Sequence, residues 1–100
     1  MGTNWLTSYE HLMASSASLT LAEDFMLNKQ MHGEEIWEEI WIDGKAFDVN
    51  IWEEDFNPEG DGRTSPVHAS LYPTIEKDNG YRETDVNLCE RLFTLDHKDQ

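Results

Sequence analysis

"GEEIWEEIWIDGKAFDVNIWEED", residues 33–55, carries the clearest strand pattern in the chain. On both sides of Asp43-Gly44, apolar and polar side chains alternate with a period of two, which is typical of β-strands with one buried face. An Asp-Gly pair between two such runs favours a two-residue turn, because both residues adopt positive φ angles with little strain. The stretch therefore predicts a β-hairpin.

The length of the turn sets the register of this hairpin. A two-residue turn places Ile40 opposite Phe47 and Ile36 opposite Ile51, whereas a three-residue turn would place Ile40 opposite Asp48. We expect the first register, because it gathers the aliphatic side chains on one face. The opposite face, called the outer face below, then carries Glu35, Trp37, Glu39, Trp41, Asp48, Asn50 and Trp52.

Two features of this register are unfavourable on their own. Glu39 lies directly opposite Asp48, and like charges in that position destabilise a strand pair. Glu38 falls on the aliphatic face opposite Val49, so it marks either the rim of the core or a bulge.

The charge of the chain narrows the classes of partner. Among 100 residues there are 21 acidic and seven basic side chains, for a net charge of −14, and residues 34–61 hold eleven acids against Lys45 alone. Such a surface repels nucleic acids and anionic membranes, so we expect no direct nucleic-acid binding and no membrane association. A need for solubility would spread the acids evenly, so their clustering favours a cationic partner.

The segment before the hairpin carries two signals for the start of a helix. Thr7 precedes Glu10 by three residues, and Thr20 precedes Glu23 by three, which is the capping-box spacing. With Gly33 as a stop signal, these patterns predict two helices. Their expected ranges are residues 8–15 and 21–32, with a linker at "ASSAS", residues 14–18.

The second half of the chain predicts another hairpin. Residues 67–75 alternate as a strand, and "DNG", residues 78–80, follows as a turn. A three-residue loop would pair Glu76 with Arg82, and we prefer it to the two-residue loop that would pair Glu76 with Glu83.

The last apolar residues are compatible with a helix or a strand. Cys89, Leu92 and Phe93 recur at the spacing of one helix face, so we expect a short helix over residues 85–95, with a strand as the second choice. The predicted fold class is α+β. It has two N-terminal helices packed on the aliphatic face of a four-stranded, mostly antiparallel meander sheet, then a short C-terminal helix, in a single domain of residues 1–100.

No motif for catalysis, a cofactor or a metal is complete in this chain. "DFNPEGDG", residues 55–62, matches the first positions of a calcium-binding loop, but Pro66 stands where a glutamate is required. We therefore expect a solvated acidic loop, no metal and no cofactor, and we do not expect an enzyme. Cys89, among leucines, is expected to be a small buried residue. Of the four histidines, only His68, on the outer face, is a candidate for a functional role.

The tryptophans of the outer face allow three interpretations. Another layer, such as the closing helix, could cover Trp37, Trp41 and Trp52. An aromatic patch ringed by charge is also the anatomy of a protein interface, in which tryptophans anchor and carboxylates select a basic partner. A symmetric dimer through this face is the third. The candidate binding residues are Glu35, Trp37, Glu39, Trp41, Asp48, Trp52, Glu53, Glu54 and Asp55.

Together these features predict a non-catalytic acidic protein that occupies a basic surface of a partner protein. Successive outward carboxylates on a strand are about 6.6 Å apart, from two rises of about 3.3 Å, which is of the order of the phosphate spacing in a nucleic-acid strand. In composition the chain resembles phage and mobile-element inhibitors that imitate DNA, and bacterial toxin-immunity proteins. A nucleic-acid mimic or inhibitor is therefore one form of the prediction.

The alternative is a small dimerising structural or ligand-binding domain that uses the tryptophan-lined face. The chain carries neither a signal-peptide pattern nor an apolar run long enough to span a membrane, so we expect a cytoplasmic protein, either monomer or homodimer.

Overall fold

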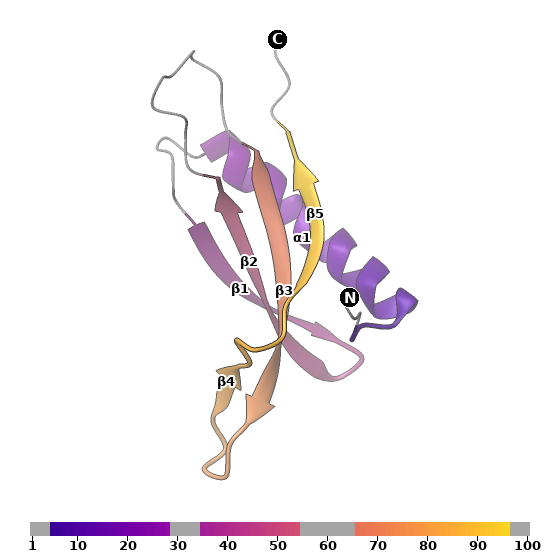
Figure 1. Ribbon diagram of the computed structural model, residues 1–100, viewed down its shortest axis with the longest axis vertical. Coiled ribbons are helices and arrows are strands. Elements are labelled where there is room, and N and C mark those ends of the chain that lie inside the picture. The colour runs from indigo at the N-terminus through magenta and orange to yellow at the C-terminus, as the bar shows by residue number, and fades with distance from the viewer. Residues whose placement is uncertain (1–4, 29–34, 55–65, 97–100) are drawn as a thin grey trace.

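A computed structural model describes residues 5–28, 35–54 and 66–96. In these residues one helix and five strands follow each other: α1 (Ser8–Asn28), β1 (Glu35–Ile42), β2 (Lys45–Glu53), β3 (Val67–Glu76), β4 (Arg82–Thr84) and β5 (Glu90–Leu95). All strand pairs are antiparallel, with β1, β2 and β3 adjacent in that order. Figure 1 shows α1 running across one face of the sheet. The α+β class is confirmed, and the single domain stays a prediction.

α1 is one continuous helix where the sequence predicted two. Its start is as predicted: the amide of Thr7 donates to Glu10 Oε1 and the amide of Glu10 donates to Thr7 Oγ1, each over 3.0 Å, so this capping box is confirmed. The second pattern, Thr20 with Glu23, lies inside the helix. The predicted end of the second helix lies outside the described residues.

The linker predicted at residues 14–18 was wrong, because its side chains suit a helix that packs closely on a sheet. Ala14, Ser18 and Ala22 recur every four residues and are completely buried, so they form one stripe along α1. Small side chains let the helix backbone approach the strands, and alanine has the highest intrinsic helix propensity. Ser18 is therefore a packing residue within a helix.

The hairpin of β1 and β2 has the predicted register. Ile40 lies opposite Phe47, and Glu39 lies opposite Asp48. The two turn residues have φ angles of 50° and 82°, so both adopt the positive values that a two-residue turn of this kind requires. The first hairpin prediction is confirmed in detail.

The hairpin of β3 and β4 also has the predicted register. Glu76 pairs with Arg82, and Thr74 pairs with Thr84. Gly80 has a φ angle of 88°, as expected for the glycine of a three-residue loop. The preference for this loop over the two-residue alternative is confirmed.

β5 stands where the C-terminal helix was predicted. Ala69 on β3 pairs with Phe93, while Ser70 pairs with Arg91, so Leu92 is an extra residue in a β-bulge. The bulge breaks the two-residue alternation and gives the apolar residues of this segment a spacing that imitates one helix face. The helix prediction was therefore wrong, and the strand that was the second choice is present.

β4 and β5 both run along β3 and are separated by residues 85–89. The amide of Asp85 donates to the carbonyl oxygen of Pro73 over 2.9 Å, after which the chain leaves β3. Pro73 has no amide hydrogen. An interruption of the ladder at this residue therefore costs no backbone hydrogen-bond donor its partner. Cys89 lies at the end of this segment and is exposed, so the prediction of a buried cysteine was wrong.

The core lies between α1 and the aliphatic face of the sheet. Its completely buried strand residues are Val49, Ile51, Val67, Ala69 and Leu71, which join Ala14, Ala22 and Phe25 of α1 in one cluster. The aliphatic face is therefore the one that packs against the helix, as predicted. The outer face is on the far side of the sheet.

Candidate protein-binding face

The outer face continues from β1 and β2 onto β3. The side chains added by β3 are those that pair with Trp52, Asn50 and Asp48: His68, Ser70 and Tyr72. Trp37 and Trp41 are 46% and 54% exposed, and Trp52 is half-buried. Because β5 takes the place of the closing helix, that helix does not cover the tryptophans.

Trp41, Arg82 and Glu39 form a cation–π and ion-pair cluster at one end of the outer face. The guanidinium carbon of Arg82 lies 4.8 Å from the centroid of the Trp41 ring, and Arg82 Nε is 3.9 Å from Glu39 Oε2. Arg82 belongs to β4, whereas Trp41 and Glu39 belong to β1, with β2 and β3 between them. The sheet must curl to bring them together, so the outer face is concave at this end.

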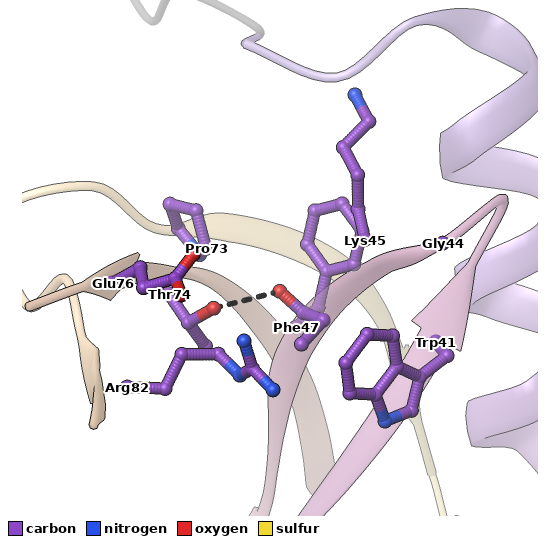
Figure 2. Close-up of a pocket in the computed structure, with 9 residues that line it drawn as sticks. Trp41, Gly44, Lys45, Phe47, Pro73, Thr74, Glu76 and Arg82 are labelled. Carbon is purple, nitrogen blue, oxygen red and sulfur yellow. Dashed lines mark hydrogen bonds between the residues drawn. The ribbon is translucent and has the colours of Figure 1, made fainter. Parts of the chain in front are cut away.

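A cleft of about 240 Å³ adjoins this cluster, where β2 and β3 separate (Figure 2). Thr74 Oγ1 donates to the carbonyl oxygen of Ala46 over 3.0 Å and bridges the two strands just beyond their last ladder pair. Lys45, Glu76 and Arg82 line the cleft. Pockets that enclose a small-molecule ligand start at about 300 Å³, so this cleft is smaller than such a pocket.

Trp37 and Tyr72 form the centre of the outer face. Their ring centroids are 5.3 Å apart with the planes tilted by 41°, and Trp37 Nε1 donates to Glu35 Oε2 over 3.4 Å. Burial raises the pKa of the Tyr72 hydroxyl, and a hydrogen bond with Cys89 and the nearby Glu35 carboxylate act in the same direction. Tyr72 therefore keeps its proton and stays a hydrogen-bond donor.

Trp52 and His68 form the other end of the face, with ring centroids 4.5 Å apart. His68 Nδ1 is 3.2 Å from Arg91 Nη1, which can only donate, so Nδ1 accepts and the ring proton is on Nε2. Nε2 then donates to Glu54 Oε1 over 3.0 Å. Nδ1 also lies 2.9 Å from the hydroxyl of Thr94. This end is held by its own hydrogen bonds.

The carboxylates predicted to form one binding surface do not all lie on the outer face. Glu35 and Glu39 are exposed on the outer face, and Glu54 is exposed at its edge, but Asp48 accepts a hydrogen bond from the hydroxyl of Thr84. Glu53 is only 5% exposed and belongs to the side that faces α1, so it is not part of this surface. The last predicted member, Asp55, lies outside the described residues.

Two arginines that the sequence did not single out as site residues lie on the outer face. Arg82 contacts Trp41 and lies near the Glu39 carboxylate, and Arg91 contacts His68. The predicted pairing of Arg82 with Glu76 could have located Arg82 on a strand, but its contact with β1 depends on the curl of the whole sheet. The outer face is consequently less negative than the sequence suggested.

Within the described parts of the chain, no cluster of three or more histidine, cysteine or acidic side chains could hold a metal ion. The helix in those parts is not long and apolar enough to cross a membrane. Comparisons with protein-family models, with curated proteins and with solved structures gave no match.

Proposed function

We propose that this chain is a non-catalytic acidic binding protein whose outer face takes up cationic side chains of a partner protein. The observation that carries the proposal is the position of Arg82, stacked on Trp41 and near Glu39. An aromatic ring beside a carboxylate binds a guanidinium through its π-face and its charge together. A partner arginine or lysine would find the same chemistry on exposed Trp37 beside Glu35.

The geometry favours discrete cation sites over imitation of a phosphate strand. On β1 the two outward carboxylates, Glu35 and Glu39, are separated by Trp37, so they lie about 13 Å apart along the strand instead of one phosphate spacing. The carboxylate of Asp48 already accepts a hydrogen bond from the hydroxyl of Thr84. We therefore propose a partner recognised by individual basic side chains between aromatic rings, with the net charge of −14 accelerating its approach.

The test measures binding of an oligo-arginine peptide by tryptophan fluorescence at about 0.1 M and about 1 M salt, because screening weakens long-range attraction over this range. We expect binding at low salt and a marked loss at high salt. Glu39→Gln should weaken binding by about twofold to fivefold, the range of an exposed ion pair. The matched control is Glu23→Gln, which removes the same charge from an exposed position of α1 and should leave affinity unchanged.

Two results would overturn the proposal. Equal losses for Glu39→Gln and Glu23→Gln would show that net charge alone attracts the peptide, with no site on the outer face. A stable dimer in sedimentation, with its tryptophans shielded from quenchers, would instead favour the dimerising domain that the sequence left as the alternative.

A further inference from the structure

β1 is an edge of the sheet in the part of the chain that the structure describes. It pairs with β2 on one side, and no described strand pairs with its other side. Five of its eight residues are exposed, and Ile36 and Ile40 are only half-buried. An edge of this length offers a row of main-chain donors and acceptors to another extended chain.

The register shows which backbone groups point away from β2. In a two-residue hairpin turn, Ile42 and Lys45 close the turn as a hydrogen-bonded pair, so the ladder alternates from there. The even-numbered residues of β1 then point to β2, and the carbonyl oxygen of Ile36 accordingly accepts from the side chain of Asn50 over 3.2 Å. The backbone groups that point outward belong to Glu35, Trp37, Glu39 and Trp41.

The charges of β1 argue against a second copy of this chain at the edge. β1 carries Glu35, Glu38 and Glu39 and no basic residue. In an antiparallel pair of two β1 strands that keeps the apolar faces together, a register centred on Glu38 or Glu39 sets that residue against its own copy. A register centred on Trp37 sets Glu35 against Glu39. Like charges directly opposite destabilise a strand pair, so self-pairing is unfavourable in these three registers.

We propose that the unpaired edge of β1 binds an extended segment of the partner in which cationic and aliphatic residues alternate. The cationic side chains would lie on the outer face beside Glu35 and Glu39, and the aliphatic ones beside Ile36 and Ile40 on the side of α1. Main-chain hydrogen bonds supply affinity in such strand addition, and the alternating side chains supply specificity. This inference rests on the proposed function and adds the conformation and the sequence pattern of the partner.

The probe is a peptide in which lysine and valine alternate, compared with a peptide of the same composition in which lysines and valines form separate blocks. We expect the alternating peptide to bind about tenfold more tightly, because it alone can place lysines beside Glu35 and Glu39 and valines beside Ile36 and Ile40 at once. Amide resonances of β1 should shift on binding, and their hydrogen exchange should slow.

Backbone pairing is tested with two N-methylated forms of the alternating peptide, one methylated at the lysines and one at the valines. Only the set whose amides face β1 should lose about tenfold or more in affinity, as lost main-chain hydrogen bonds predict. The amides that face β1 are those of the lysines if the added strand is antiparallel. They are those of the valines if the added strand is parallel.

The outcomes separate this inference from the proposed function. If both methylated peptides and the blocked peptide bind as tightly as the alternating one, strand addition is wrong, while a loss for Glu39→Gln would still support a cation-binding face. If none of the lysine peptides or the oligo-arginine peptide binds at low salt, both proposals fall.

Discussion

Lys45 Nζ donates to Glu10 Oε2 over 2.8 Å and so connects the turn of the first hairpin to the first turn of α1. The same carboxylate accepts from the amide of Thr7 in the capping box. One side chain thus caps the helix and fixes its start to the sheet.

This contact predicts a pH-dependent stability. The hydrogen bond from Lys45, followed by that from Thr7, holds the pKa of Glu10 below its ordinary value of 4.5. A carboxyl group whose pKa is lowered by folding stabilises the protein above its unfolded pKa, and this stabilisation is lost as the pH falls through the folded pKa. Lys45→Met should therefore cost up to about 1 kcal/mol in the free energy of unfolding at neutral pH. The cost should shrink below pH 4.5 in urea titrations.

The control for this prediction is Lys77→Met. It removes the same charge from an ion pair with Glu83, 3.2 Å long, in which both side chains are exposed. A smaller loss is expected there. Equal losses for the two variants would assign the effect to the net charge of the chain.

The continuity of α1 predicts a large effect of proline at Ser16. This residue is exposed in the middle of the helix, at a position where the sequence suggested a linker. Ser16→Pro should cost about 3 kcal/mol or more, because proline removes a helical hydrogen bond and clashes with the preceding turn. Ser16→Ala should be neutral or slightly stabilising. A Ser16→Pro protein with an unchanged denaturation midpoint would restore the two-helix interpretation.

The first turn predicts a backbone effect at Gly44. Its φ angle is 82°, and a side chain at this position would meet no atom within 4 Å, so any cost of substitution comes from the backbone. Gly44→Val should destabilise the fold by about 1 to 3 kcal/mol, whereas Gly44→Asn should cost less, because asparagine tolerates positive φ. Chemical denaturation of both variants checks the turn assignment, which a harmless valine would contradict.

Arg82 predicts a variant with increased affinity. Arg82→Gln frees Trp41 and Glu39 for a partner cation and removes one positive charge from the outer face. Affinity for the oligo-arginine peptide should rise by about fivefold, the value of one exposed cation–π contact of about 1 kcal/mol. Arg91→Gln is the control, with the same change of charge beside His68 at the other end of the face. If both variants gain equally, the Trp41 cluster is not the binding site.

The tryptophans and the rim acids should affect different rate constants. Trp37→Ala should cost about 2 kcal/mol in binding through a faster off-rate, as expected for an aromatic anchor. Glu54→Gln, at the edge of the face, should mainly slow association. Surface plasmon resonance with the immobilised alternating peptide measures both, and identical kinetic changes in the two variants would contradict this division.

Local signals explain why the hairpins were predictable. Asp43-Gly44 fixes its own turn, and the alternation on both sides leaves one register that keeps the aliphatic residues together. β5 could not be predicted in the same way, because the bulge at Leu92 belongs to its pairing with β3 and not to its own sequence. The continuity of α1 was missed because serine-rich stretches also occur in linkers, and only burial of Ser18 against the sheet decides between them.

The outer face was predictable in part for a similar reason. Side chains alternate between the two faces of a strand, and this alternation places Trp37, Trp41 and Glu39 outward, as the structure shows. The same alternation places Glu53 with Val49 and Ile51 on the inner side, so the position of Glu53 could have been found from the sequence. The contact of Arg82 with Trp41 could not, because it depends on the curl of several strands together.

The way α1 crosses the sheet has a consequence for folding cooperativity. The helix contacts β1, β2, β3 and β5, so its buried stripe is complete only when elements from both ends of the described chain have assembled. A helix of 21 residues gains most of its stability from tertiary packing and little from propensity alone. Loss of β5 should therefore weaken the packing of α1 as well as the pairing with β3. Far-ultraviolet circular dichroism and tryptophan fluorescence should accordingly report one coincident unfolding transition.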